Sequence, residues 1–278
     1  MGAKQTEYVS LRNDLLFPMV FTRNLVALKA LLAALLGIPE AEIDRIEVLN
    51  PIQYSEVITT KPTVLDLKVH LNDGAYILVE MQVRRFHFWT NRTLAYACRA
   101  VADQVKEEFD YGTLEPVIQI AIMNYSLFPE HRRFFAKYTP RDEEAFEYTD
   151  KLRVYVLDLT QIEAATEEQK RQGLVEWARA FRAKSWEEVK CIVNSGVKEA
   201  AKTMQVIMSN PTERDMIRMR QDAQSDRRTE LNAARRAGER QGEKRGKVEM
   251  AKILKREGVD PAIIVKSSGL TLEEIAAL

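Results

Sequence analysis

Two acidic residues lie on consecutive segments in which apolar residues occur at every second position. Their spacing suits metal-assisted chemistry. Asp66 lies in the run 64–71, Glu80 lies in the run 76–83, and Asn72-Asp73-Gly74 separates the two runs. Two carboxylates held close together on rigid strands repel each other unless a divalent cation lies between them. Mg²⁺, with Mn²⁺ as the alternative, activates a bound water for attack on phosphorus. The pair therefore points to hydrolysis of a phosphodiester bond.

The two runs predict a β-hairpin that brings these carboxylates together. Side chains alternate between the two faces of a strand, and a turn centred on Asp73 places Leu67 opposite Val79. The apolar faces of the two strands then match. In the same register Asp66 lies directly across from Glu80, at a Cβ separation of roughly 4.5 to 5.5 Å.

Two further polar residues share the face of the hairpin that carries the acids. Gln82 lies two residues beyond Glu80 and is placed to orient a water, while Lys68 is placed to stabilise negative charge from the facing strand. The alternative interpretation is a solvated hairpin face on which Lys68 neutralises its acidic neighbours. The spacing of these residues is compatible with both interpretations.

The elements around the hairpin predict an α/β protein with a mixed sheet and flanking helices. Helices are expected at 11–17, ending near Pro18, and at 25–36. A further helix is expected at 91–109, with Asn91 as its N-cap. Strands are expected at 45–50, 117–123 and 152–159, and the helical pattern continues through 161–181 and 186–208.

The C-terminal part of the chain has a different composition. Residues 212–257 are highly charged, with glycines at every fourth position from 238 to 246, and predict an exposed helix. The last twenty residues predict two short helices joined at Gly269. We therefore expect a core at 1–160, a helical extension packed on that core at 161–210, and a charged helical arm with a small helical hairpin at 211–278.

Charge and cysteine content limit the classes of protein to which this chain can belong. The formal net charge is zero, but residues 218–258 hold 13 Lys+Arg against 7 Asp+Glu. Such a basic segment is typical of an element that faces phosphates, or of a solvated linker. Cys98 and Cys191 lack metal-ligand spacing and are expected to be free thiols in a cytoplasmic protein. The longest apolar stretch, 25–38, is too short to cross a bilayer, so no membrane span is expected.

The motifs themselves resemble a known family. Leu65-Asp66-Leu67-Lys68, followed by Val79-Glu80-Met81-Gln82, resembles the D…ExQ variant of the PD-(D/E)XK nuclease superfamily, in its recombination-promoting nuclease and transposase branch. Further matching features are Asn13–Phe17, Arg92 and Tyr96, the stretch 111–128, and the end of the tail at 272–275. The resemblance extends over nearly the whole chain.

The resemblance implies a restriction-endonuclease-like core and a set of site residues. Mg²⁺ would be bound by Asp66, Glu80 and the carbonyl of Met81, and Asp14 would be an additional catalytic acid. Two departures stand out: Leu65 occupies the place of a frequent proline, and an uncharged glutamine, Gln82, stands where the family usually has lysine.

Two basic residues are expected to contact nucleic acid. They are Lys68 on the hairpin and Arg92 on the helix that follows it. The alternative role for Arg92 is a salt bridge.

These inferences predict a Mg²⁺-dependent endonuclease that cuts double-stranded DNA, in the context of recombination or transposition. The first alternative is a catalytically silent DNA-binding protein that has kept the fold. The second is a helical interaction protein in which residues 212–278 are the working part. In the nuclease interpretation, the C-terminal helices are an accessory arm for DNA binding or for self-association.

Overall fold

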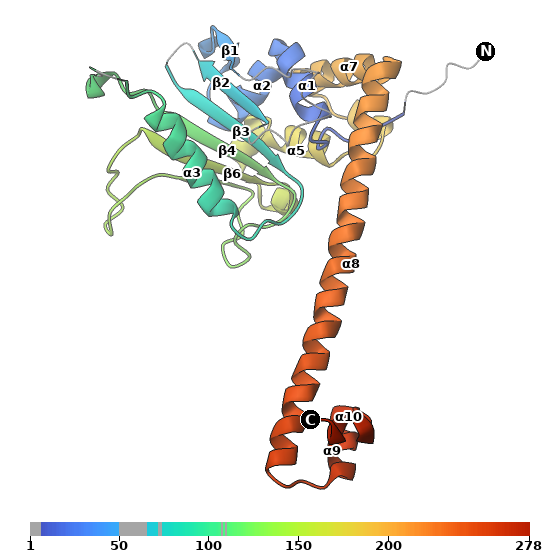
Figure 1. Ribbon diagram of the computed structural model, residues 1–278. Coiled ribbons are helices and arrows are strands. Elements are labelled where there is room, and N and C mark those ends of the chain that lie inside the picture. Colours follow the sequence, from blue (N-terminus) through green and yellow to red (C-terminus); the bar gives the residue numbers. More distant parts are fainter. Residues whose placement is uncertain (1–6, 50–65, 72–73, 107, 109) are drawn as a thin grey trace, which may run out of the picture. The chain divides into compact units, whose positions relative to one another are not determined.

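The computed structural model describes residues 7–49, 66–71, 74–106, 108 and 110–278. In these residues a mixed sheet has the strand order β1-β2-β3-β4-β6-β5 (Figure 1). The strands are β1 (Ile46–Val48), β2 (Leu67–Leu71), β3 (Tyr76–Gln82), β4 (Val117–Met123), β5 (Phe135–Tyr138) and β6 (Leu152–Asp158). The three central strands β3, β4 and β6 are parallel, and the outer strands pair antiparallel. The predicted α/β fold with a mixed sheet is confirmed.

Ten α-helices occur in the described residues. They are α1 (Leu16–Arg23), α2 (Leu25–Leu36), α3 (Trp89–Ala102), α4 (Glu167–Arg171), α5 (Leu174–Arg182), α6 (Trp186–Lys190), α7 (Ser195–Ser209), α8 (Pro211–Arg256), α9 (Pro261–Ser268) and α10 (Leu272–Ala276). Short 3-10 helices span Glu40–Glu42 (η1), Tyr111–Thr113 (η2) and Leu159–Ala164 (η3).

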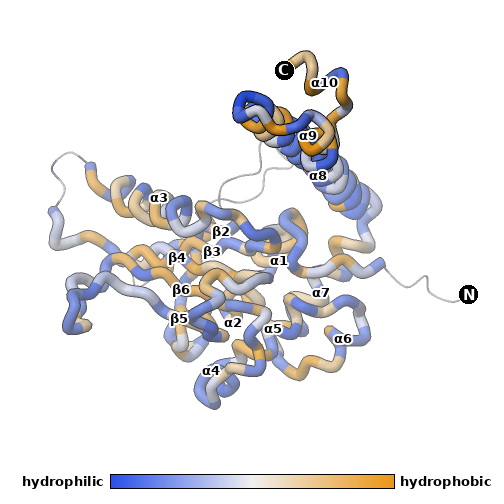
Figure 2. Tube along the Cα trace, turned by 90° about the horizontal axis from the view of Figure 1, so that it is seen from below, coloured by the Kyte–Doolittle hydropathy of each residue, from blue (hydrophilic) through white to orange (hydrophobic). Residues whose placement is uncertain are grey.

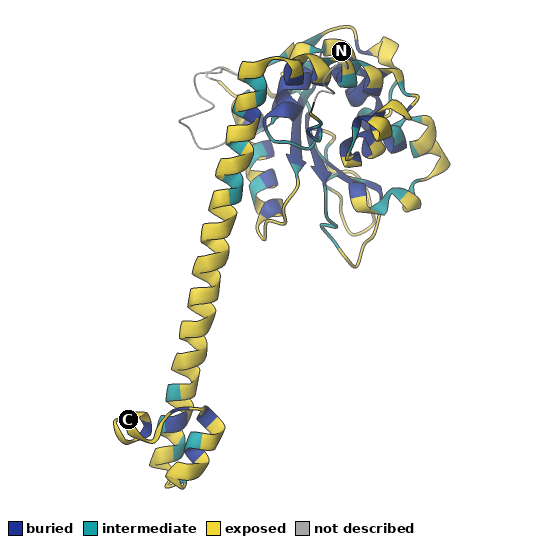
Figure 3. Cartoon of the chain, turned by 90° about the vertical axis from the view of Figure 1, so that its right-hand side faces the viewer, coloured by how far each residue is buried: buried dark blue, intermediate teal, exposed yellow. Residues whose placement is uncertain are grey.

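The sheet has a buried face on each side, as the apolar sequence of β4 requires. Every residue of β4 is buried, because parallel strands are covered on both faces. Figure 3 shows buried residues gathered in the sheet and in the helices that pack on it. Helix α3 covers one face, where Leu78 and Val117 pack with Ala97 and Ala100. On the other face, residues of the sheet form one large core with residues of α1, α2, α5 and α7. Apolar residues are accordingly concentrated in β4 and α2 in Figure 2.

The apolar N-terminal helices belong to this core. None of the described helices alone is long and apolar enough to cross a membrane. Helices α1 and α2 together meet the criteria of length and composition, but they are bent by 105° at the break between them.

The chain divides into two compact units, Met1–Ile217 and Arg218–Leu278. In the second unit, the end of α8 packs with α9 and α10 around Ala251, Ile264, Leu270 and Ile275. Gly269 ends α9 with a φ of 69°, a left-handed conformation that favours glycine. The two predicted short helices joined at this glycine are therefore confirmed, as is the predicted helix in the charged segment.

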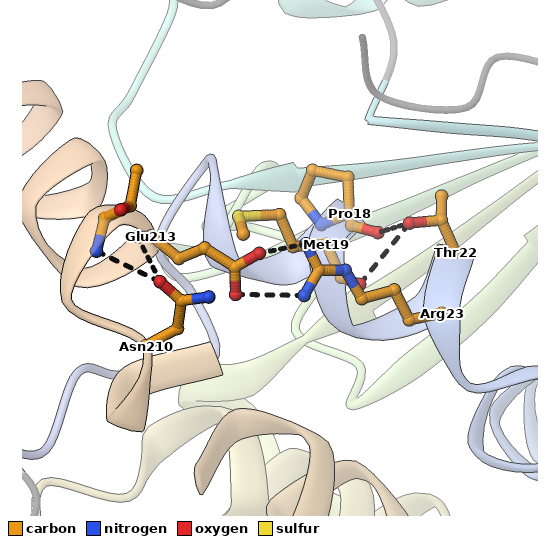
Figure 4. A network of polar contacts seen from close by, with 7 residues as sticks. Pro18, Met19, Thr22, Arg23, Asn210 and Glu213 are labelled. Carbon is orange, nitrogen blue, oxygen red and sulfur yellow. Dashed lines mark hydrogen bonds and ion pairs between the residues drawn. The ribbon is translucent and has the colours of Figure 1, made fainter. Parts of the chain in front are cut away.

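The first turn of α8 is attached to α1 by an ion pair within the first unit (Figure 4). Arg23 donates two hydrogen bonds to Glu213, from Nη1 to Oε2 at 3.0 Å and from Nη2 to Oε1 at 2.6 Å. Asn210 accepts hydrogen bonds from the N–H groups of Thr212 and Glu213 and so caps this turn. Asn210 and Pro211 thus form the N-terminus of a new helix.

The predicted bounds of two helices were wrong at both ends. Helix α1 starts at Leu16 and contains Pro18 in its first turn, where the missing N–H costs no hydrogen bond. The side chain of Asn13 instead accepts from the N–H groups of Leu15 and Leu16. Helix α3 starts at Trp89, so Asn91 lies inside the helix and is not its N-cap, and it ends at Ala102, well before the expected end at 109.

Other differences concern short elements. Strand β5 was not predicted, because four residues at a sheet edge carry little periodic signal. The expected strand at 152–159 ends one residue earlier, at Asp158. The expected helices at 161–181 and 186–208 are divided into η3, α4 and α5 and into α6 and α7. Asn50, Val64, Leu65, the expected turn residues Asn72 and Asp73, and Phe109 lie outside the described residues.

Candidate active site

The hairpin of β2 and β3 has the predicted register. Leu67 pairs with Val79, and Val69 pairs with Ile77. Asp66 immediately precedes β2. The last pair of the two strands is therefore Leu67 with Val79, one position short of the predicted pair of Asp66 with Glu80. The Asp66 side chain closes this end of the hairpin instead, because its Oδ2 accepts a hydrogen bond from the N–H of Met81 at 2.6 Å.

Burial dominates the electrostatics of Asp66. Desolvation raises the pKa of this carboxyl group to about 7, although the hydrogen bond from Met81 lowers it. The negative charges of Glu80 and Asp14 raise the pKa further, and the positive charge of Arg92 lowers it. The carboxylates of Asp14 and Glu80 therefore lie close enough to that of Asp66 to affect its pKa.

Glu80 is the most enclosed of the predicted acids. It is 5% exposed, and burial raises its pKa to about 7 despite the neighbouring guanidinium of Arg92. Its Oε1 accepts a hydrogen bond from Arg92. Its Oε2 is buried and has no hydrogen-bond partner among the described residues. A buried carboxylate oxygen of this kind is a strong candidate ligand for a cation.

Helix α3 adds a positive charge to the site. Arg92 Nη2 contacts Glu80 and lies 3.2 Å from Oε1 of Gln82. The guanidinium also lies over two aromatic rings, 4.9 Å from the ring centroid of Phe86 and 6.0 Å from that of Tyr96. The structure thus places Arg92 directly on the polar face of the hairpin.

The other predicted residues take different positions. Gln82 uses both ends of its amide, since Nε2 donates to the carbonyl of Arg84 at 2.7 Å and Oε1 accepts from Arg92. Lys68 has its Nζ 5.9 Å from the ring centroid of Tyr76. Asp14 lies in the turn before α1 and comes to the site from the N-terminal segment.

Residues at the carboxyl end of β4 also reach the site, and the sequence analysis did not single them out as site residues. The N–H of Asn124 donates to the carbonyl of Gln82 at 2.9 Å, and its Oδ1 accepts from Arg12 Nη1 at 2.6 Å. The hydroxyl of Tyr125 accepts from the N–H of Phe86, and burial raises the pKa of Tyr125, with a smaller contribution from the charge of Glu80. Their position directly after a predicted strand could have indicated this role, because parallel sheets bind ligands beyond the carboxyl ends of their strands.

The donor set suits a hard divalent cation. No three Asp, Glu, His or Cys side chains form a ready metal cluster in the described part of the chain. Mg²⁺, however, commonly uses one or two carboxylates and keeps several waters. Asp66 and Glu80 supply two carboxylates. The carbonyl of Met81 lies on the same side of β3 as its N–H, which faces Asp66.

A mixed sheet with flanking helices, and acidic residues gathered at a central hairpin, is the arrangement of the PD-(D/E)XK fold. The family model of the PD-(D/E)XK nuclease family transposases matches residues 11–234, and the chain belongs to this family. The matched segment includes Asp14, Asp66, Glu80 and Gln82. No curated protein and no solved structure matches the chain.

Proposed function

We propose that this protein is a divalent-metal-dependent endonuclease that hydrolyses phosphodiester bonds in double-stranded DNA. The observation that carries the proposal is that the half-buried Asp66 lies near the buried Glu80 and that desolvation raises the pKa of both to about 7. Removing two neighbouring carboxylates from water is costly, because their charged forms lose solvation and repel each other. A cation shared between them offsets this cost.

The residues around the acids have separable roles in this reaction. Asp66, Glu80 and the Met81 carbonyl would hold Mg²⁺, which supplies charge stabilisation and an activated water when bound. Asp14 adds negative charge on the N-terminal side of the site. The Gln82 amide carries no charge and orients neighbouring groups through its two hydrogen bonds.

Plasmid nicking tests the proposal most directly. Asp66→Asn and Glu80→Gln proteins are expected to nick supercoiled plasmid about 100-fold more slowly than wild type in Mg²⁺, because each removes a ligand charge. Glu143→Gln is the matched control, since Glu143 is exposed on the loop before β6. Thermal unfolding of each variant verifies that the fold is intact. Wild-type rates in both folded site variants would contradict the proposal.

A second candidate function is supported by Gln82. The position that carries a lysine in most related sites holds a neutral amide here, and that amide is occupied by Arg92 and the Arg84 carbonyl. The candidate is a DNA-binding protein with the same fold and no cleavage. DNA affinity without nicking by wild type, in Mg²⁺ and in Mn²⁺, would favour it.

A further inference from the structure

Among the residues that the structure describes, Arg92 is the only basic residue whose side chain is seen to donate a hydrogen bond to Asp66 or Glu80. It reaches Glu80 from α3, so the helix that covers the sheet supplies the countercharge for a residue of the sheet. Its side chain is 30% exposed, while that of Glu80 is 7% exposed. The guanidinium therefore lies at the boundary between the buried carboxylate and solvent.

A guanidinium is suited to this position. It stays charged at all relevant pH values and is weakly hydrated, so it can enter a half-buried site at lower cost than an ammonium group. The rings of Phe86 and Tyr96 add cation–π contacts to the same group. Removing the partner of a buried carboxylate is strongly destabilising, because the remaining charge is left uncompensated.

The same carboxylate is the one that a metal ion would need. Glu80 offers one oxygen to Arg92, and its second oxygen has no hydrogen-bond partner among the described residues. Two cations drawn to one carboxylate within a few ångströms repel each other. Each cation therefore weakens the hold of the other on Glu80.

We propose that Arg92 is a positioning residue that acts as the internal counter-ion of Glu80 and competes with the divalent cation for this carboxylate. The inference rests on the proposed function, because it assumes a metal site at the hairpin. Competition between two ligands for one group is a negative coupling, and it is reciprocal. Arg92 thus stabilises the metal-free protein and lowers its affinity for metal.

Calorimetric titration of Mg²⁺ into the full-length protein tests this coupling. Arg92→Met is expected to bind Mg²⁺ about 5- to 50-fold more tightly than wild type, because the competing charge is removed. Arg92→Lys keeps the charge and loses the planar fork, so it is expected to lie between the two. Arg99→Met is the matched control, because Arg99 is exposed on the same helix, and it should leave the affinity unchanged.

A stability measurement separates this role from simple loss of packing. In chelator, Arg92→Met should melt at a lower temperature than wild type, and the double variant Glu80→Gln/Arg92→Met should recover most of this loss. Mg²⁺ should raise the melting temperature of Arg92→Met by more than it raises that of wild type.

The outcomes distinguish this inference from the proposed function. Equal or weaker Mg²⁺ binding by Arg92→Met, with wild type binding and nicking normally, would overturn the competition alone. Absence of Mg²⁺ binding in both proteins would overturn the competition and the metal-dependent activity together. Detectable binding only in Arg92→Met would support the competition even if wild type proves to be a silent DNA-binding protein.

Discussion

At the scale of single residues, the candidate site is a balance of buried charges. Asp66 and Glu80 were predicted to converge because the two strands alternate cleanly and the turn fixes their register. Tyr125 and the pair of Arg12 with Asn124 were not predicted to reach the site. They come from segments far apart in sequence, and no local periodicity reports interactions over such distances.

The raised pKa of Asp66 makes a prediction about the stability of the metal-free protein. Because the folded state binds this proton more tightly than the unfolded state, the contribution of Asp66 to stability falls as the pH rises from about 4 through about 7. In chelator, Asp66→Asn should therefore be more stable than wild type by about 1 to 3 kcal/mol at about pH 8, after allowance for solvent screening, and nearly equal to it at about pH 4.

Urea unfolding across this pH range measures the difference. Glu143→Gln provides the comparison for a carboxylate that is exposed to solvent, and its stability should follow that of wild type at each pH. A constant difference between Asp66→Asn and wild type would show that this carboxyl group titrates normally.

At the scale of elements, the structure depends on close packing between helices that the sequence pattern predicts only in part. The apolar helix α2 and the strand β4, which is apolar except for Gln119, were predicted with their observed bounds, because long periodic or continuous apolar runs are strong signals. The start of α1 was not, because a proline is compatible with the first turn of a helix as well as with its end.

Gly196 on α7 provides a test of this packing. A Cβ at this position would lie 2.3 Å from the Cβ of Ala30 on α2 and 3.0 Å from Cζ2 of Trp177 on α5. Gly196→Ala should therefore destabilise the first unit by about 1 to 3 kcal/mol, as overpacking does, although alanine favours helix formation.

The matched control is Gly238→Ala, because nothing lies within 4 Å of a Cβ at that position of α8. This change should be neutral or should stabilise α8 by up to about 1 kcal/mol. Chemical denaturation followed by circular dichroism measures both variants. Equal stability of Gly196→Ala and wild type would mean that α2 and α7 separate without cost.

At the scale of the whole molecule, charge is distributed unevenly between the two units. The first unit contains the acidic site, whereas residues 218–258 carry an excess of six positive charges. The sequence predicted the charged helix from composition, and the structure confirms that it is helical and largely exposed. Composition alone does not identify the partner of this helix, because a solvated linker and a phosphate-binding element have similar residues.

Salt-dependent DNA binding tests whether these charges face phosphates. The triple variant Arg227→Gln, Arg236→Gln and Arg245→Gln removes three exposed cations of α8. If the helix binds DNA, the slope of log affinity against log salt should decrease by about 0.9 for each phosphate that the variant no longer neutralises. The corresponding triple lysine variant keeps the charge and should retain the slope. An unchanged slope in the glutamine variant would assign α8 to another role.

The three glycines of α8 have a consequence for the lifetime of its backbone hydrogen bonds. Gly238, Gly242 and Gly246 have open space where side chains would be, and each lowers the intrinsic helix propensity by roughly 1 kcal/mol relative to alanine. We therefore expect this stretch to open to solvent more often than the ends of α8. Its amide hydrogens should exchange early, and its frequent arginine and lysine residues should make it a substrate for trypsin-like proteases during each opening.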